Sequence, residues 1–300
     1  MLGIALVIAA CALWALDTLI RYPLLESGVS AYSIVLYEHI LLSLVSVVIF
    51  VKSFKKLWNT KISHIFYFMI VGGIGSALAT LAFTRAFTIL NPSIVIILQK
   101  FQPVIAIALA RFVLKETIQK EFIFWAAICL GGALLISFDD FYNIYNSSKS
   151  LTDLFFHDEA PTGYILVLFS VIGWGAATVF GKKLVQEGFS DEQIMAGRFS
   201  MGLLFLLPFA TAENFNFSYS IDVYGKISLM VFVSGLLAMY IFYEGLRRIS
   251  ARACTLSEMF FPFMAVIVNW LFLDASLTTV QLVGGGVLLL GSIVIQYKHY

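Results

Sequence analysis

Charged residues are scarce in this chain of 300 residues. Asp, Glu, Lys and Arg together make up 12% of it, which is about half of the share that is usual in soluble domains. Hydrophobic residues make up 60%, and the mean hydropathy is +0.93. The formal net charge is only +1, so nucleic acid has no electrostatic reason to bind. The composition therefore predicts an integral membrane protein whose surroundings are the lipid bilayer.

Cysteine is also scarce, and the common signatures of catalysis are missing from the sequence. Cys11, Cys129 and Cys254 lie within or at the edge of apolar segments and not at metal-ligand spacing, so we expect no disulfide and no metal site. There is no HExxH pattern and no phosphate-binding glycine loop, so we expect no enzyme activity, no cofactor and no ATP hydrolysis. No basic stretch precedes the first apolar segment, which we therefore interpret as a retained helix rather than a signal peptide.

Long apolar runs dominate what is present. A helix needs about 20 apolar residues to cross the hydrocarbon core, and ten segments satisfy this requirement. They are 2–21, 31–51, 64–89, 92–114, 119–138, 161–181, 190–211, 224–246, 252–273 and 278–297. The fold class is therefore predicted as an all-α integral membrane protein with ten transmembrane helices. A first five-helix domain at 1–138 and a second at 161–300 are separated by a polar external loop at 139–160.

The two halves of the chain resemble each other. Four residues of the first half, Trp14, Thr18, Gly28 and Ser30, return 160 residues later as Trp174, Thr178, Gly188 and Ser190. Because each half contains an odd number of spans, the second copy inserts upside down. Inverted repeats of this kind are typical of secondary transporters, which work by alternating access.

Basic residues orient the chain in the membrane. The side that carries both termini receives thirteen of the nineteen Lys and Arg residues, and the other side receives four, Arg21, Arg85, Lys149 and Lys226. Since basic loops remain in the cytoplasm, we expect both termini to be cytoplasmic and the loop 139–160 to be external.

Four ionisable residues within the spans are related by the repeat. Glu38 corresponds to Arg198, and Arg85 corresponds to Glu244. These positions suggest a Glu38–Arg85 pair near the outer side and an Arg198–Glu244 pair near the inner side. Two interpretations remain open: the pairs are alternating gates, or they only neutralise charges close to helix ends.

A second polar group surrounds two prolines in the middle of spans. Pro103 and Pro262 are equivalent by the repeat, and each is expected to kink its helix near the membrane midplane, where transporters place substrate. Gln99 and Lys100 precede the first proline, and Glu258 precedes the second. In one interpretation Lys100 binds a carboxylate or phosphate of the substrate and Glu258 binds an amine or a proton. In the other, Lys100 and Glu258 form a structural ion pair.

Aromatic residues complete the candidate site. Four of them are candidates for the lining of a central cavity, with packing or an interfacial belt as the alternative: Trp14, Trp174, Tyr240 and Tyr243. Asp17 lies one helical turn after Trp14 and is a second candidate proton carrier besides Glu258.

These patterns together resemble the EamA-type members of the drug/metabolite transporter superfamily. The resemblance rests on the regions of Trp14 and Trp174, on Gly197–Phe199 (GRF), on Gln99–Pro103 (QKFQP) with Leu114–Glu116 (LKE), and on Ser257–Phe263 (SEMFFPF). It covers nearly the whole chain as two copies of the domain. It implies a carrier of the bacterial inner membrane with a central cavity and with metabolites, amino acids or drugs as substrates.

Two positions depart from the family pattern. The arginine expected in the second span is Arg198 in the second copy but Glu38 in the first. The acidic residue Glu116 is replaced by an Asp274–Ala275 junction in the second copy.

The sequence therefore predicts a secondary transporter of the inner (cell) membrane that moves a small metabolite by alternating access. The substrate is an amino acid, an amphipathic metabolite or a drug-like compound, and export and proton coupling are hypotheses that the sequence leaves open. One alternative is an exchanger of organic anions or phosphate esters that uses Lys100. Another, from a different class, is a membrane receptor or scaffold without transport. Because one chain contains both halves of a pathway, we expect a functional monomer, although a dimer is compatible with the sequence.

Overall fold

The computed structural model is helical, and no strand occurs in the residues that it describes, which are 1–49, 61–90, 92–138, 142, 145–146, 159–210, 218–272 and 278–298. The elements in chain order are α1 (Leu2–Glu26), α2 (Ala31–Ile49), α4 (Ile62–Phe68), η1 (Met69–Leu78), α5 (Ala79–Ala86), α6 (Pro92–Gln99), α7 (Gln102–Val113), α8 (Lys120–Ile136), α11 (Ala160–Gln186), α12 (Asp191–Leu206), η2 (Leu207–Phe209), α13 (Ile221–Met230), η3 (Val231–Leu237), α14 (Ala238–Arg248), α15 (Ala251–Glu258), α16 (Phe260–Phe272) and α17 (Thr279–Tyr297). They overlap the apolar segments predicted from the sequence. Most of the predicted loop 139–160, and the Asp274–Ala275 junction, lie outside the described residues.

Six helical runs in the described residues are long and apolar enough to cross a membrane. They are Leu2–Glu26, Ala31–Ile49, Ile62–Ala86, Ala160–Gln186, Ile221–Arg248 and Ala251–Phe272. Gln102–Val113 and Thr279–Ile295 are shorter apolar helices. A helix bonds all of its interior backbone groups within itself, which is the condition for a segment to lie in hydrocarbon.

Several of these runs are interrupted in ways that shape the interior. The run Ile62–Ala86 contains the π-helical segment η1, and the run Ile221–Arg248 contains the π-helical segment η3. The helix α6 ends at Gln99 and α7 begins at Gln102, so this break lies immediately before Pro103. A corresponding break at Met259 separates α15 from α16, three residues before the helical Pro262. Such interruptions free backbone groups and turn polar side chains inward.

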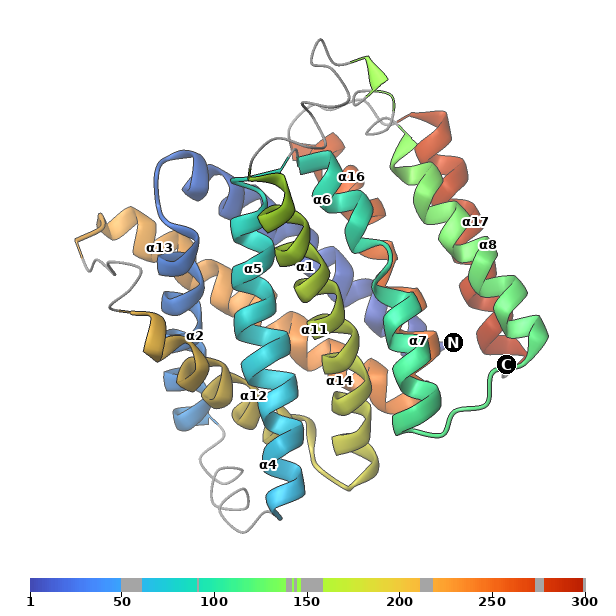
Figure 1. Cartoon of the computed structure of the whole chain (residues 1–300), viewed down its shortest axis with the longest axis horizontal. Helices are drawn as coiled ribbons and strands as arrows, with labels where there is room; N and C mark the ends of the chain where they lie inside the picture. Colours follow the sequence, from blue (N-terminus) through green and yellow to red (C-terminus); the bar gives the residue numbers. More distant parts are fainter. Residues whose placement is uncertain are drawn as a thin grey trace.

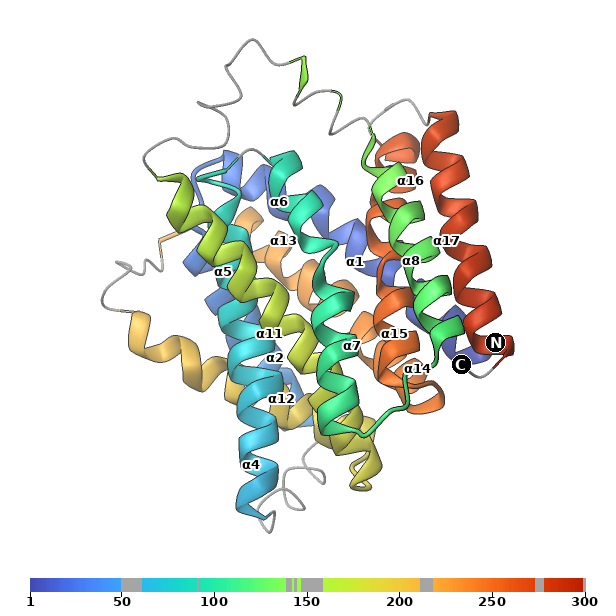
Figure 2. The same ribbon diagram turned by 45° about the vertical axis from the view of Figure 1, so that its right-hand side comes forward.

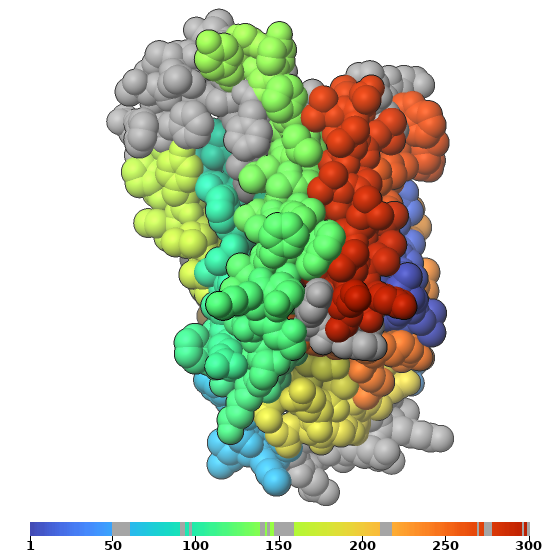
Figure 3. Space-filling view, turned by 90° about the vertical axis from the view of Figure 1, so that its right-hand side faces the viewer, coloured from blue at the N-terminus to red at the C-terminus, as the bar shows by residue number. Residues whose placement is uncertain are grey.

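The helix α11 packs against η1, α5 and α7, while α1 packs against α14 and α16 (Figures 1 and 2). The helices α8 and α17 lie side by side at one edge of the molecule, and Figure 3 shows them together on that face. Gly132 and Gly284 lie where these two helices touch, and a Cβ atom on either glycine would meet the carbonyl oxygen of the other. Small residues allow this close approach of helix backbones in a membrane.

Two turns with the same conformation begin the second helix of each half. Gly28 follows α1 with a φ of 89°, and Gly188 follows α11 with a φ of 90°, a region that glycine adopts without a steric cost. In both turns the next helix is preceded by a serine, Ser30 or Ser190, whose hydroxyl accepts a hydrogen bond from a backbone nitrogen three residues later. These glycines and serines are among the residues that recur at an interval of 160 in the sequence.

Candidate functional site

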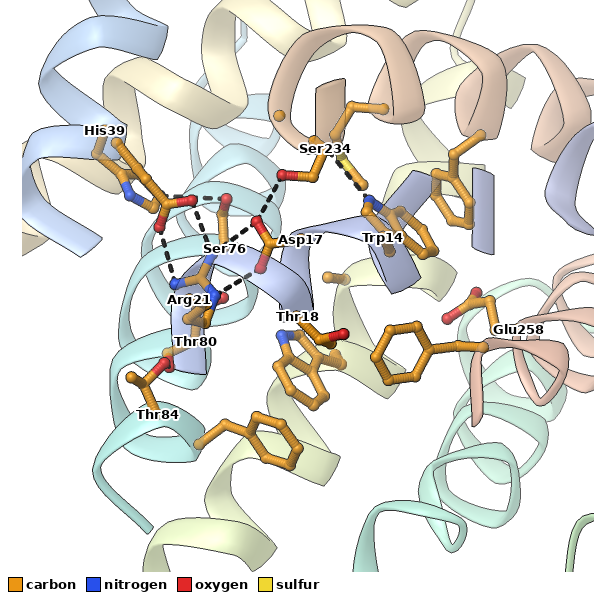
Figure 4. Close-up of a pocket in the computed structure, with 18 of the residues that line it drawn as sticks. Trp14, Asp17, Thr18, Arg21, His39, Ser76, Thr80, Thr84, Ser234 and Glu258 are labelled. Atoms are coloured by element: carbon orange, nitrogen blue, oxygen red, sulfur yellow. Dashed lines mark hydrogen bonds and ion pairs between the residues drawn. The ribbon is translucent and has the colours of Figure 1, made fainter. Parts of the chain in front are cut away.

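A cavity of about 260 Å³ lies between the two halves of the chain. Its walls come from α1, α2, η1, α5, α11, α12, η3 and α14 and from the broken ends of α6, α7, α15 and α16 (Figure 4). Its polar lining residues are Asp17, Thr18, Arg21, Glu38, His39, Ser76, Thr80, Thr84, Gln99, Gln102, Thr178, Arg198, Ser234 and Glu258, and its aromatic lining residues are Trp14, Tyr22, Phe83, Phe87, Trp174, Phe199, Phe242 and Phe261. The cavity therefore offers both hydrogen-bonding groups and flat apolar surfaces.

Three charged residues form one buried cluster in the wall of the cavity. Arg21 bonds Asp17 through Nε at 2.6 Å and Nη2 at 3.3 Å. The same guanidinium bonds Glu38 through Nη1 at 3.1 Å and Nη2 at 2.7 Å. One cation thus holds two carboxylates, and charge-assisted bonds of this kind fix side chains firmly in a medium of low dielectric.

The two π-helical segments each contribute a serine to this cluster. Ser234 of η3 donates a hydrogen bond of 2.8 Å to Asp17, and its carbonyl oxygen accepts a bond of 3.2 Å from the Trp14 indole. Ser76 of η1 lies 3.3 Å from Nε2 of His39, whose Nδ1 lies 2.8 Å from the carbonyl oxygen of Val35. Because a carbonyl can only accept, the neutral His39 ring carries its proton on Nδ1 and accepts from Ser76.

Glu258 lies across the cavity from this cluster, at the end of α15 (Figure 4). Gln102 donates to one carboxylate oxygen over 2.8 Å, and Thr178 donates to the other over 3.0 Å. Cys254 lies 3.7 Å from the same oxygen as Thr178. Among the described residues, the hydrogen-bond donors to Glu258 are neutral, in contrast to the arginine that holds Asp17 and Glu38.

Arg198 is a second buried guanidinium in the lining. Its Nη1 donates a hydrogen bond of 3.1 Å to the hydroxyl of Tyr243, which is fully buried behind it. Arg198 lines the same cavity as His39 and Glu258.

Aromatic rings separate the polar groups. The rings of Trp174 and Phe83 pack edge to face with centroids 4.7 Å apart, and Phe83 packs in the same way on Phe87 at 4.9 Å. Trp14 packs on Phe242 with centroids 5.4 Å apart. Such edges and faces can bind a flat ring by stacking.

Most of the residues predicted from the sequence as substrate-binding line this cavity: Trp14, Asp17, Gln99, Trp174 and Glu258. Lys100 does not line it. Lys100 is buried beside a smaller adjoining cavity of about 30 Å³, together with Pro103 and Pro262. Glu258 lines both cavities, and it accepts hydrogen bonds from Gln102 and Thr178.

Tyr240 was predicted to line the cavity, but it lies on the outer face of α14, where its exposed fraction is 43%. The buried residues of this helix are Met239, Phe242, Tyr243 and Leu246, so its inner face turns Tyr240 away from the cavity. Tyr243, a candidate for the cavity lining, is fully buried and contacts the site through Arg198, but it does not line the cavity itself.

The prediction of a Glu38–Arg85 pair is corrected by the structure. Glu38 pairs instead with Arg21. The sequence interpretation placed Arg21 at the end of the first span, whereas α1 continues to Glu26 and carries Arg21 inside the helix, one turn after Asp17. Arg85 is exposed in the last turn of α5.

The Arg198–Glu244 pair is corrected in the same way. Glu244 pairs with Arg248 one turn later on α14, at 2.5 Å. Arg198 instead bonds the preceding residue, Tyr243. Neighbouring residues of a helix point about 100° apart. Glu244 therefore faces away from Arg198, although Tyr243, one residue earlier, faces toward it.

Sequence reasoning missed several polar lining residues, namely Arg21, Ser76, Gln102 and Ser234. The spacing of four residues between Asp17 and Arg21 is a signal that could have identified that pair, because such residues meet on one helix face. The repeat gave no signal for the two serines, which the π-helical segments turn inward.

Comparisons with known proteins agree with this architecture. A model of the EamA-like transporter family matches residues 1–138 and 161–297. The riboflavin transporter ImpX of Fusobacterium nucleatum subsp. nucleatum is 27% identical over 300 residues, which cover 97% of this chain and 96% of that protein. The uncharacterized transporter YetK of Bacillus subtilis is 25% identical over 194 residues, 63% of this chain and 54% of its own length. A solved structure, described as a crystal structure of protein, is 13% identical with a TM-score of 0.74 and covers 98% of this chain and 96% of that one, which shows likeness of fold.

The apolar helices and the family match together identify an integral membrane transporter. The chain belongs to the EamA-like transporter family, whose model matches nearly its whole length.

Proposed function

We propose that this protein is a secondary carrier for a small amphipathic metabolite that contains a flat ring, and that riboflavin is the first compound to test. The observation that carries the proposal is one cavity in which aromatic rings lie beside a hydrogen-bonding cluster. Riboflavin combines a flat heteroaromatic ring with a chain of hydroxyl groups, and the name of the Fusobacterium relative supports this choice.

The two sides of the cavity match the two parts of such a molecule. Trp174, Phe83 and Phe87 form a connected aromatic wall, which can hold the ring by stacking. Thr80 and Thr84 also line the cavity, on the helix face next to Ser76, and supply hydroxyl groups for a polar chain. Ligand sites commonly combine an apolar surface with a few polar groups that set orientation.

The mechanism that we propose is alternating access between two inverted five-helix repeats, with ten transmembrane helices and both termini in the cytoplasm of a bacterial cell. The matching turns at Gly28 and Gly188, the paired π-helical segments and the paired helix breaks support a repeat relationship. Rocking of the halves about a cavity near the midplane then exposes the site to each side in turn.

Glu258 is the better candidate of the two proposed proton carriers. Asp17 is held by Arg21 and Ser234, and removing its charge would leave a cation with one partner fewer. Glu258 is held by the neutral donors Gln102 and Thr178, which can also accept a hydrogen bond from a protonated carboxyl group after rotation. Transport coupled to protons would therefore pass through Glu258.

The first experiment is a binding titration of riboflavin against the full chain purified in detergent, followed by uptake into proteoliposomes. Stacking on tryptophan quenches flavin emission, so we expect saturable quenching in the wild type and a weaker affinity in Trp174→Ala. Base–aromatic stacking is worth about 1–3 kcal/mol, which corresponds to a loss of roughly 5-fold to 150-fold.

Trp125→Ala is the matched control, because Trp125 lies on α8, packs on Phe124 and does not line the cavity. Riboflavin that neither binds to the wild type nor enters vesicles would exclude it as the substrate. Equal affinity in Trp174→Ala and the wild type would remove the aromatic wall from the binding site.

A further inference from the structure

Two buried arginines line the same cavity, but they differ in their partners. Arg21 forms four hydrogen bonds with the carboxylates of Asp17 and Glu38. Arg198 donates one hydrogen bond to a described side chain, the neutral hydroxyl of Tyr243. No described carboxylate lies within 4.0 Å of the Arg198 guanidinium. Arg21 is therefore paired with two carboxylates, whereas Arg198 has no carboxylate partner among the described residues.

Burial makes this difference significant. Arg198 is only 9% exposed, and its Nε is sealed and has no hydrogen-bond partner in the described part of the chain. A guanidinium carries five N–H donors, and among the described residues Arg198 uses one of them, toward Tyr243. A buried charge without a partner is strongly unfavourable in a membrane and commonly marks a binding site.

We infer that Arg198 binds an anionic group of the transported compound, a carboxylate or a phosphate ester carried by the same molecule as the flat ring. This inference deepens the proposed function and rests on its assignment of the cavity as the substrate site. The planar fork of a guanidinium matches two oxygens of a carboxylate or phosphate, which is the geometry that an ammonium group does not offer.

The neighbours of Arg198 prepare it for this role. Tyr243 is fully buried and holds the guanidinium through Nη1, so it acts as a positioning residue. Phe199 and Phe242, the chain neighbours of Arg198 and Tyr243, both line the cavity. Arg198 therefore lines the same cavity as the aromatic rings that are proposed to hold the substrate.

The carboxylates of the cavity are held by other residues and are not partners of Arg198, and the other candidate cation for anion binding lies elsewhere. Asp17 and Glu38 are taken up by Arg21, and Glu258 is taken up by Gln102 and Thr178. Lys100, the cation that sequence analysis proposed for anion binding, lies at the adjoining cavity of about 30 Å³, which is too small for a metabolite.

The test compares matched anionic and neutral probes on the full chain in detergent. Benzoate and phenyl phosphate are paired with benzyl alcohol, and riboflavin 5′-phosphate is paired with riboflavin. We measure the dissociation constant of each from the shift of the melting temperature with ligand concentration. We expect the wild type to bind the anionic member of each pair at least about 10-fold more tightly, since a hydrogen-bonded charge pair contributes that much.

The variants assign the preference to Arg198. Arg198→Gln is expected to bind both members of each pair equally, and Arg198→Lys to keep part of the preference. Arg248→Gln is the matched control, because it removes a positive charge from the exposed Glu244–Arg248 pair outside the cavity. Tyr243→Phe provides a second variant if Arg198→Gln does not fold: it keeps the ring and removes the hydroxyl, and we expect the anion preference to fall several-fold.

The outcomes separate this inference from the proposed function. Equal binding of anionic and neutral probes to the wild type, or an anion preference that survives in Arg198→Gln, overturns the role of Arg198. Binding of benzoate and phenyl phosphate without binding of either flavin supports Arg198 and excludes the flavin assignment. Tight binding of riboflavin with no gain from its phosphate supports the proposed function and overturns the inference.

Discussion

The carboxylate of Glu116 accepts a hydrogen bond of 2.8 Å from the backbone nitrogen of Ala251, which lies 135 residues later in the chain. The other oxygen of Glu116 accepts a bond of 3.3 Å from the backbone nitrogen of Arg252. The hydroxyl of Ser250 accepts a third bond of 3.2 Å, from Ala253. The first three backbone donors of α15 are therefore satisfied, two of them by the first half of the chain. Since α15 ends at Glu258, this cap also fixes the helix that carries the cavity carboxylate.

Replacing Glu116 with Ala should destabilise the contact between the halves. The substitution leaves two backbone donors at the buried start of α15 without partners and removes a negative charge from a helix N-terminus. Loss of a cap costs about 0.5–2 kcal/mol, so we expect a melting temperature several degrees lower in detergent. Glu116→Gln, which keeps an oxygen acceptor, should recover part of the loss.

Glu121→Ala is the matched control for this prediction. Glu121 is an exposed acidic residue in the first turn of α8, and it makes no cap across the two halves. Equal shifts for Glu116→Ala and Glu121→Ala would show that the bonds to Ala251 and Arg252 do not stabilise the fold.

The cluster of Asp17, Arg21 and Glu38 predicts an unusually large effect for one substitution. Arg21→Gln leaves two neighbouring carboxylates in the membrane interior without their cation. Removal of one partner from a buried ion pair costs about 3–5 kcal/mol, so we expect severe loss of folded protein in detergent, measured by size-exclusion recovery and thermal unfolding.

The neutral triple variant Asp17→Asn, Arg21→Gln, Glu38→Gln tests the reason for this loss. It removes the unpaired charges together and should restore much of the stability lost in Arg21→Gln. If the triple variant were less stable than Arg21→Gln, the loss would come from altered packing and not from unpaired charge.

This same cluster shows where sequence reasoning succeeds and where it ends. The hydropathy of segments and the position of Pro103 are local properties, so they indicated the helices and the break between α6 and α7. The partner of Glu38 is not a local property, because it depends on how α1 and α2 are rotated about their axes. The repeat relates Glu38 to Arg198 in sequence, but it does not determine which side chains of neighbouring helices meet.

The position of Tyr240 concerns a single helix. The apolar segment that contains it was predicted, but Tyr240 lies four residues before Glu244, on the polar face of the amphipathic helix α14. This spacing was a signal against an inward position that the prediction did not use. Trp14 and Trp174 were placed in the cavity because the repeat supplied a second signal for them, whereas Tyr240 had none. Ser76 and Ser234 escaped prediction because their inward orientation arises within π-helical segments, whose altered turn the sequence did not indicate.

The glycines of the bundle differ sharply in how much space surrounds them, and this predicts opposite outcomes for one substitution. A Cβ atom on Gly72 would collide with the backbone carbonyl of Arg198 on α12, and backbone cannot move aside as a side chain end can. Overpacking costs about 1–3 kcal/mol, so Gly72→Ala should lower the melting temperature. Because it also displaces Arg198, it should weaken the binding of benzoate.

Gly131→Ala is the matched substitution, since a Cβ atom there meets no atom within 4 Å. Gly131 is in the interior of α8, where alanine is favoured over glycine by about 0.5–1 kcal/mol, so stability should rise or stay the same. A melting temperature that falls as much for Gly131→Ala as for Gly72→Ala would contradict this account of helix packing.

Glu258→Gln separates binding from coupling, because glutamine resembles a carboxyl group that is permanently neutral. If Glu258 carries the coupling proton, the variant should bind substrate and exchange it between equal pools on the two sides of a vesicle, yet fail to accumulate it when a pH gradient is imposed. Thr178→Val is the matched control: it removes one donor to the carboxylate, which remains bonded to Gln102, and it should retain accumulation at a reduced rate.

Both variants are measured in proteoliposomes with the substrate that the binding titrations identify. Full accumulation by Glu258→Gln under a pH gradient would show that the proton passes elsewhere or that transport is not coupled to it. Loss of exchange as well as accumulation would instead place Glu258 among the groups that substrate binding or the conformational change requires.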